Sequence, residues 1–319
     1  MGIKYLNKHL QSTCSNSIKQ ISLHELSGKR IVIDTSIYLY RFLGDNALLE
    51  NFYLMISIFR QHNIIPLFVF DGKPPKEKEE LLKRRKAGKK EAESKYKELK
   101  NKLSHVPEDE KHDIEETMLS LKKDFIRVHH TDIENVKMLI QSYGVSYIEA
   151  PGEADKLCAK MVCKNKAYAC LSEDMDLFVY GCPRVLRYLS LLKKKVIMYD
   201  LKGMVEDMKM SFDEFQSICI VSGTDYNIES DNSTTLSQTL KHFKKYKSSN
   251  NTKSEFYEWL QENTKYVENV DSLYIIKEMF NLKNMHEYKN YDKLKIINGP
   301  CNMNNLKLVM EKEDFIFVG

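Results

Sequence analysis

Short apolar segments rich in β-branched residues alternate with stretches in which apolar residues recur at helical spacing. Residues 29–34 (KRIVID) and 64–70 are the clearest strands, and residues 48–62 form the clearest helix. The same pattern predicts further strands at 145–149, 167–171, 184–189 and 195–199, and further helices at 36–42, 132–143, 153–164 and 212–221. Thr131 is the expected N-cap of the helix over 132–143. This alternation predicts an α/β fold with a mainly parallel central sheet flanked by helices.

A long charged segment interrupts the alternation. Residues 76–124 are helical by propensity, with a break expected near Pro107, and contain few large apolar residues. We therefore expect this segment to stand apart from the main core. The resulting division has four parts: residues 1–72 and 131–227 build the core, 73–130 form the charged insertion, and 228–319 form a C-terminal helical region.

The overall composition excludes several classes of protein. A hydrophobic content of 42% and a charged content of 29% exclude a wholly disordered chain. The longest apolar run, residues 64–70, is far shorter than the roughly 18 residues of a membrane-spanning helix. The start, MGIKYLNKHL, lacks the apolar segment of a signal peptide. The seven cysteines include no CxxC pair, which argues against a disulfide framework or a zinc ribbon. We expect an intracellular protein in a reducing compartment, with no membrane partner.

Charge is distributed unevenly along the chain. The chain carries +4 in total, but residues 73–104 alone contain 13 Lys and Arg against 6 Glu. Residues 241–253 contain five lysines and no acid. Basic segments attached to an otherwise acidic body indicate a polyanionic partner.

Acidic residues stand where the predicted parallel strands end. Asp34 and Asp71 end or follow the first two strands, and Asp174 and Asp176 follow the strand over 167–171. Glu149 ends another strand, and Glu153 and Asp155 begin the helix after it. Since parallel strands present their carboxyl ends at one edge of a sheet, these acids should gather there. Each acid alone suits a helix cap or turn, but gathered carboxylates repel one another unless cations neutralise them.

Oxygen ligands without His or Cys favour a hard cation such as Mg²⁺ or Mn²⁺. Mg²⁺ keeps several waters, so this many acids exceed the needs of one ion, whereas two ions about 4 Å apart would use them better. Such a pair catalyses phosphodiester hydrolysis. Asp225, within the sequence GTDY, lies outside the strand series and is equally compatible with a plain turn.

Six segments together resemble the flap endonuclease family, part of the XPG-like structure-specific 5′ nucleases. They are listed in chain order: MGIKYL at the start, IVIDTSIYLYRF (31–42), FVFDGKPPKEKEELLKRR (68–85), EAPGEADKLCA (149–159), SEDMDLFVYG (172–181) and VSGTDYN (221–227). The resemblance implies a PIN-like α/β nuclease core, with residues 73–130 as the helical arch through or beneath which a single-stranded 5′ flap passes. It also implies a flap endonuclease and 5′–3′ exonuclease acting in DNA replication, repair or recombination.

The resemblance also implies residue roles. The ligands of two Mg²⁺ ions, replaceable by Mn²⁺, would be Asp34, Asp71, Glu153, Asp155, Asp174, Asp176 and Asp225. Within this set, Asp71, Glu153, Asp155 and Asp174 resemble the ligands of one ion and Asp176 and Asp225 those of the other, while Asp34 acts mostly through water. Glu149 matches no ligand position.

Further roles follow for residues that contact DNA. Lys78 resembles a residue that contacts the scissile phosphate, as does either Arg84 or Arg85. Tyr40 resembles an aromatic on which a base stacks, although it is also compatible with an ordinary core position. Gly2 resembles the mature N-terminal residue near the active site.

Two regions depart from the family pattern. The hairpin that grips duplex DNA with a monovalent cation is replaced at 227–235 by NIESDNSTT, which lacks glycine and proline. We therefore expect little dependence on potassium, with Lys241, Lys244, Lys245 and Lys247 as compensating DNA contacts. The C-terminal sequence shows no sliding-clamp motif, so clamp binding is not expected.

The predicted partner is branched DNA with a 5′ single-stranded arm, bound by a monomer. Three alternatives remain: a junction-binding protein with impaired catalysis, an RNA-directed nuclease of the same fold, and a phosphatase. The last is disfavoured because IVIDTSIY lacks a second Asp two residues after the first. The sequence leaves the compartment open between a nucleus and a viral replication site.

Overall fold

The computed structural model describes residues 3–103, 117–118, 120–227, 235–249, 255–283, 291, 294, 296–313 and 315. The described residues form one seven-stranded sheet in the order β1-β7-β6-β5-β2-β3-β4. The strands are β1 (Ile18–Ser22), β2 (Arg30–Asp34), β3 (Ile65–Phe70), β4 (Ser146–Glu149), β5 (Ala169–Leu171), β6 (Arg184–Ser190) and β7 (Lys195–Asp200). Strands β4, β3, β2, β5 and β6 run parallel, and β7 pairs antiparallel with β6 and β1. The predicted α/β fold with a mainly parallel sheet is confirmed.

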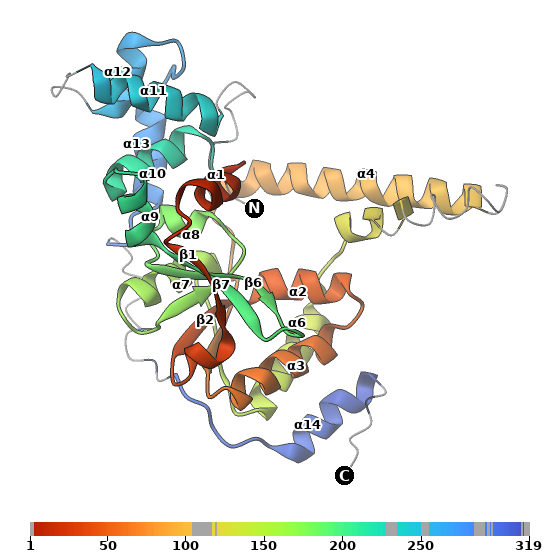
Figure 1. Ribbon diagram of the computed structural model, residues 1–319. Helices are drawn as coiled ribbons and strands as arrows, with labels where there is room; N and C mark the ends of the chain where they lie inside the picture. The colour runs from red at the N-terminus through yellow and green to blue at the C-terminus, as the bar shows by residue number, and fades with distance from the viewer. Residues whose placement is uncertain are drawn as a thin grey trace.

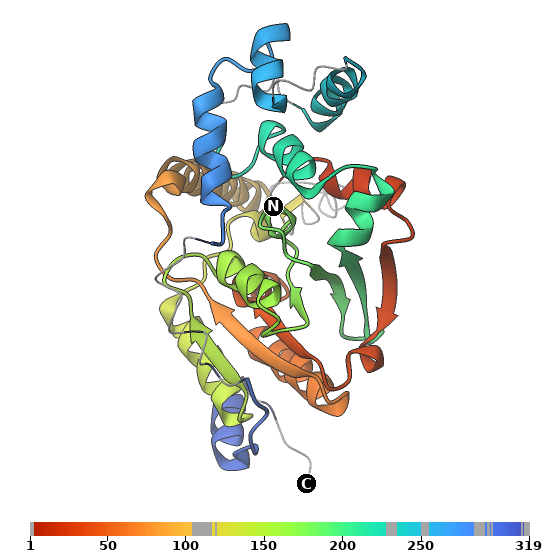
Figure 2. The ribbon, with the colours of Figure 1, turned by 90° about the vertical axis from the view of Figure 1, so that its left-hand side faces the viewer.

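Helices cover both faces of the sheet (Figure 1). One face packs against α2 (Thr35–Gly44), α3 (Leu48–Gln61), α6 (His130–Ser142) and α14 (Met303–Met310). The other face packs against α1 (Leu6–Thr13), α7 (Ala154–Cys163), α8 (Asp176–Val179) and α10 (Phe212–Val221). Successive residues of β2 serve opposite faces, with Ile31 and Ile33 in the first core and Val32 in the second. Figure 2 shows α14 alongside α6 at the lower end of the body.

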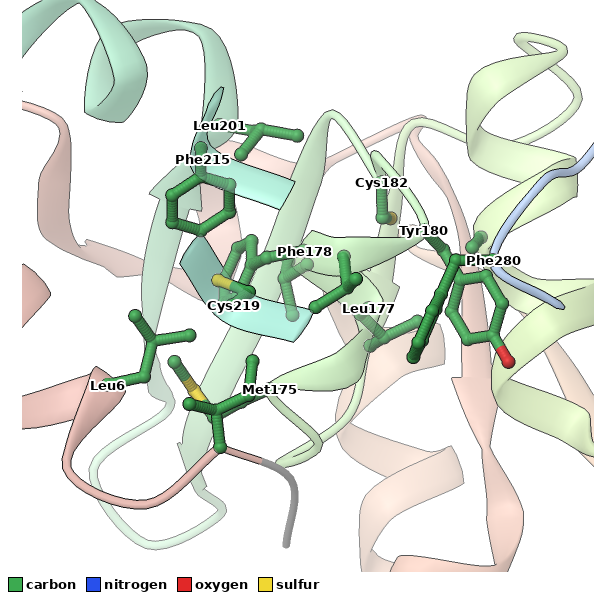
Figure 3. Close-up of a cluster of buried hydrophobic side chains, with 14 of the residues drawn as sticks. Leu6, Met175, Leu177, Phe178, Tyr180, Cys182, Leu201, Phe215, Cys219 and Phe280 are labelled. Carbon is green, nitrogen blue, oxygen red and sulfur yellow. The ribbon is translucent and has the colours of Figure 1, made fainter. Parts of the chain in front are cut away.

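The hydrophobic core on the face of α1, α7, α8 and α10 contains residues from the first and the last of the six sequence segments named above. Figure 3 shows Leu6 of α1 and Phe178 of α8 packed near Phe215 and Cys219 of α10. All four side chains are buried. This packing holds α1, α8 and α10 together on the side of the sheet where α7 begins.

Several short elements escaped the prediction, including α1, β1, α8 and α9 (Leu201–Asp207). The expected N-cap of α6 is wrong: the helix begins at His130, and His129, not Thr131, is the N-cap. The Asp132 carboxylate accepts the His129 backbone N–H at 2.7 Å, so the start of this helix is fixed by an acid in its first turn.

The charged insertion leaves the body after β3. A short 3-10 helix, η2 (Lys76–Lys78), leads into the long helix α4 (Glu79–Leu103), which projects away from the sheet (Figure 1). Ion pairs at i,i+4, such as Lys95 with Glu91 and Lys97 with Glu93, support the exposed helix. The break expected near Pro107 lies outside the described residues. Farther along α4, Tyr96 packs against Phe125 and Glu93 pairs with Arg127.

A helical group of α10, α11 (Leu236–Ser248), α12 (Phe256–Asn263) and α13 (Val270–Met279) stands beside the carboxyl edge of the sheet (Figure 1). Residues 296–302 lie against the body, where Asn298 bridges to Val145, and lead into α14. None of the helices in the described ranges is long and apolar enough to cross a membrane.

Candidate metal centre

The carboxyl edge of the parallel strands gathers four predicted acids. Asp34 is the last residue of β2, Asp71 follows β3, and Asp174 and Asp176 follow β5. Because β2 lies between β3 and β5, these three chain segments are direct neighbours. The order of the strands thus brings together residues that are up to 142 positions apart in the sequence.

Hydrogen bonds connect these segments with α7. Asp71 accepts the Ala154 backbone N–H at 2.7 Å, which holds the start of α7 against the end of β3. Ser172 donates its hydroxyl proton to Asp34 at 2.9 Å, which joins β5 to β2. Glu153, the N-cap of α7, and Asp155 in its first turn are therefore held beside the strand ends.

Asp225 reaches the same region from the turn after α10. Gly223 has a φ of 103°, a conformation that side-chain-bearing residues rarely adopt, and it starts this turn. Tyr226 donates its hydroxyl proton to Glu153 at 2.8 Å. The turn is thereby tied to α7, and all seven predicted ligands lie in one connected region.

Burial and mutual repulsion raise the pKa of three of these carboxyl groups. For Asp34 the causes are burial and then Asp71, and for Asp155 they are burial and then Glu153. For Asp176 they are burial, Asp174 and Asp225. Asp176 is only 1% exposed, and its Oδ1 atom has no hydrogen-bond partner within the described part of the chain. A buried, unpartnered carboxylate oxygen among other carboxylates is suited to a cation.

Lys78 and Arg85 partly neutralise this charge. The Lys78 ammonium is 2.6 Å from Glu153 and 3.7 Å from Asp225, although the residue is only 5% exposed. Burial opposes its charge, but Asp155 and Glu153 outweigh burial and hold the pKa of Lys78 above its usual value. Arg85 pairs with Asp225 at 2.9 Å. These contacts place both cationic groups directly against the acidic cluster.

The sequence left Arg84 and Arg85 as alternatives, and the structure separates them. Arg84 pairs with Glu80 on the same exposed helix, where both side chains are largely in solvent. Arg85 faces the acidic cluster through Asp225. Arg85 thus forms an ion pair with a member of the acidic cluster, whereas the ion pair of Arg84 with Glu80 stays on α4.

The acids do not stand as a ready-made ligand set. Among the described residues, no group of three His, Cys, Asp or Glu side chains is arranged to hold a metal ion. Several carboxylate oxygens are instead engaged by Ser36, Ser172, Lys78 and Arg85. The chemistry of the donors nevertheless fits Mg²⁺ or Mn²⁺, since all of them are hard carboxylate oxygens and one is buried without a partner.

The remaining predicted residues lie in different settings. Tyr40 is 44% exposed and carries the Lys89 ammonium 4.6 Å above its ring, so the alternative of a core aromatic is wrong. Lys241, Lys244, Lys245 and Lys247 are exposed on α11, and Lys247 pairs with Glu214. Gly2 and residues 228–234 of the altered hairpin lie outside the described residues. Glu149, which matched no ligand position, pairs with Lys137 at 2.5 Å.

Sequence reasoning missed several supporting groups. Ser36 donates to Asp71, Ser172 donates to Asp34, and Tyr226 donates to Glu153. Phe280, at the end of α13, packs edge-on against Tyr226. Ser172 and Tyr226 belong to matched segments, but their hydroxyl partners depend on loop geometry that a sequence does not display.

Two regions of the chain match known protein families. Residues 1–92 match the XPG N-terminal domain and residues 144–225 match the XPG I-region, together more than half of the chain. Flap endonuclease 1 of Candida tropicalis is 32% identical over 246 residues, which cover 71% of this chain and 63% of that protein. Flap endonuclease 1 of Methanocaldococcus jannaschii is 35% identical over 227 residues, which cover 65% of each chain.

A solved structure of the catalytic core of Rad2 in complex with DNA substrate shares the fold. It superposes with a TM-score of 0.69 at 17% identity, covering 98% of this chain and 94% of that one. The chain spans somewhat under two thirds of the length of the curated relatives it matches. The matched regions contain all seven acids as well as Lys78 and Arg85.

Proposed function

The chain belongs to the XPG-like family that includes the flap endonucleases, and we propose that it is a structure-specific 5′ nuclease acting on branched DNA. One observation carries the proposal. Seven carboxylates from five parts of the chain gather at one end of the sheet, and two cationic side chains from the insertion face them. Gathered, mutually repelling acids are typical of sites where a cation or a catalytic task offsets the repulsion.

We propose that the acids hold two Mg²⁺ ions, with Mn²⁺ as a substitute. Asp71, Glu153, Asp155 and Asp174 would hold one ion and Asp176 and Asp225 the other, with Asp34 acting through water. Bound divalent ions supply an activated water and stabilise the leaving oxygen in phosphodiester hydrolysis. The division of the ligands between the two ions is the one that the family resemblance implies. The raised pKa values of Asp34, Asp155 and Asp176 support a bound cation, because each carboxylate would return to its charged form beside one.

Other residues would bind and orient the substrate. Lys78 and Arg85 would leave their carboxylate partners to bind the scissile phosphate and stabilise the negative charge that develops there. Tyr226 would keep Glu153 oriented through its hydroxyl group. Tyr40, exposed beside α4, would stack a base near the cleaved bond.

The shape and charge of the insertion support a single-stranded 5′ arm as part of the substrate. Residues 73–104 carry 13 basic against 6 acidic residues, and α4 presents them on a helix that projects from the body. Such a helix suits the backbone of a single strand. The four-part division at residues 72, 130 and 227 remains part of this proposal, as do a monomeric state and independence from a sliding clamp.

Cleavage of end-labelled 5′-flap DNA under single-turnover conditions tests the proposal. Matched nicked duplex, single-stranded DNA and an RNA flap are cleaved in parallel. We expect Mg²⁺-dependent cleavage near the flap junction, abolished by EDTA and by Asp176→Asn. Glu149→Gln is the matched control, because Glu149 lies at the same sheet edge but pairs with Lys137 instead of joining the cluster.

Each other outcome has a definite meaning. Tight flap binding without cleavage by the wild type would instead indicate a catalytically impaired junction-binding protein. Preferential cleavage of the RNA flap would indicate an RNA-directed nuclease. Equal activity of Asp176→Asn and the wild type would refute the metal assignment.

A further inference from the structure

A second polar network lies directly behind the loop that carries Asp174 and Asp176. Its centre is Arg187 of β6, which is only 5% exposed. The guanidinium donates to Asn7 of α1 at 2.5 Å and to the backbone carbonyl of Glu173 at 2.9 Å. It also lies over the rings of Tyr188 and Tyr199, at 4.8 and 5.4 Å from their centroids.

Arg187 hydrogen-bonds to Glu173 through the backbone carbonyl and also forms a longer ion pair with the Glu173 carboxylate. Its nearest acid is Glu173, but Arg187 Nε and Glu173 Oε2 are 3.6 Å apart, and neither atom has a hydrogen-bond partner among the described residues. The short bond goes instead to the Glu173 carbonyl. Arg187 therefore holds the backbone of the residue that immediately precedes Asp174.

Glu173 is engaged from its other side as well. Its carboxylate accepts the Tyr188 backbone N–H at 2.6 Å. Tyr188 has a φ of 56°, which is unusual for a residue with a side chain, and stands where the β6–β7 register shifts. Backbone outliers persist where the surrounding structure over-determines them and often lie at functional sites. The carboxylate of Glu173 is one of the groups that fix this conformation.

Asn7 brings the N-terminal helix into the same network. Its Oδ1 atom accepts from Arg187 and from the Tyr199 hydroxyl at 2.9 Å, and its Nδ2 donates to the Tyr188 hydroxyl at 2.8 Å. Three hydrogen bonds thus join the Asn7 side chain to residues of β6 and β7. The Arg187 guanidinium therefore contacts both α1, through Asn7, and the backbone of Glu173.

From this arrangement we propose that Arg187 is a positioning residue, which couples α1 to the loop carrying Asp174 and Asp176. The inference rests on the proposed function, since it concerns how that metal centre is held. The Asp174 N–H donates to Ser172, and the Asp176 N–H donates to Asp174. A displacement of Glu173 is therefore transmitted directly to both acids. Groups that orient metal ligands change metal affinity or activity by about 10- to 100-fold when removed.

The test compares Arg187→Lys with Arg184→Lys. Arg184 is a matched control on the same strand: its guanidinium donates to the Tyr168 carbonyl at 2.7 Å and lies over the Tyr168 ring, away from the acidic loop. Mn²⁺ binding to the protein without DNA is measured by electron paramagnetic resonance, and single-turnover cleavage is measured as a function of Mg²⁺. We expect Arg187→Lys to weaken Mn²⁺ binding by about 10-fold or more and to raise the Mg²⁺ requirement for cleavage. Arg184→Lys should change neither.

Asn7→Ala provides a second variant, because Asn7 is only half-buried and its loss leaves the sheet intact. It should weaken Mn²⁺ binding in the same direction, and the effects of Asn7→Ala and Arg187→Lys should be less than additive when combined. If Arg187→Lys and Asn7→Ala bind Mn²⁺ like the wild type, or if Arg184→Lys weakens it equally, the positioning role is refuted. If the wild type itself binds no Mn²⁺, the proposed function fails instead, and the positioning role fails with it.

Discussion

Replacing Asp176 by Asn should stabilise the protein in the absence of metal while abolishing cleavage. Asn has nearly the same shape as Asp but carries no charge, and its amide can donate to neighbouring carboxylates. The Asp176 side chain is buried beside Asp174 and Asp225, and its Oδ1 atom lacks a partner within the described residues. An unsatisfied buried polar group costs about 1–3 kcal/mol. With an unfolding entropy of about 2.1 cal/mol/K per residue, this gain corresponds to a rise of roughly 2–4 °C in Tm.

The pH dependence provides a sharper test of the same substitution. The pKa of Asp176 is raised in the folded protein, so the folded state keeps a proton that the unfolded chain has already released. As pH rises from about 4 through the raised pKa, the free energy of unfolding of the wild type falls by up to about 1.4 kcal/mol per pH unit. Asp176→Asn lacks this fall, so its advantage in Tm should widen with pH. Asp34 and Asp155 titrate in both proteins, so their contributions largely cancel in the difference between the two free energies of unfolding.

Thermal melts followed by circular dichroism in EDTA between pH 4 and 8.5 measure this difference. Glu149→Gln is the control, since that carboxylate is exposed and paired with Lys137. Saturating Mg²⁺ should reverse the order, because binding at 100 times the Kd stabilises the wild type by about 2.7 kcal/mol and the variant much less. Identical melting curves for the wild type and Asp176→Asn at every pH in EDTA would refute the argument that Asp176 is repelled by its neighbours.

Three further predictions follow from the site. Arg85→Ala should slow single-turnover cleavage by about 100-fold, as expected for loss of a group that stabilises transition-state charge, whereas Arg84→Ala should have little effect; equal rates for the two variants would contradict the assignment. Tyr40→Ala should weaken flap binding by about 1–3 kcal/mol in a fluorescence titration and Tyr40→Phe should not, because stacking needs the ring alone. Replacing K⁺ by Na⁺ at constant ionic strength should leave flap affinity unchanged, since residues 227–235 lack the glycines of the family hairpin; a large specific K⁺ effect would contradict this interpretation.

The fold class was predictable because the physical signal is local. Residues 29–34 and 64–70 are apolar, short and followed by Asp, and such segments are typical of buried parallel strands. Strand β1 lacks that signal, since only Ile21 of IKQIS is buried. It forms because its backbone pairs with β7, a strand that lies far away in the sequence. The N-cap at His129 was missed for a different reason: its defining contact is local, but it comes from the Asp132 side chain three residues on and not from the capping residue's own type.

Within the site, the sequence predicts which types of residue are present but not which way their side chains point. The seven acids follow from strand ends and from the family resemblance. The choice between Arg84 and Arg85 does not, because adjacent residues on a helix point about 100° apart and a shift of one position decides which faces the acids. The contributions of Tyr226 and Arg187 depend on the turn after α10 and on the irregular part of β6. Neither feature leaves a periodic trace in the sequence.

The antiparallel pairing of β1 with β7 has a consequence during synthesis of the chain. Ile18 pairs with Tyr199, so β1 leaves the ribosome well before the strand on which it will pair. At about 5–20 residues per second, the interval is roughly 9–36 s. An unpaired strand edge is a site of aggregation during such a delay. Lys19 and Gln20 are exposed in β1, and their polarity keeps the waiting strand soluble until its partner emerges.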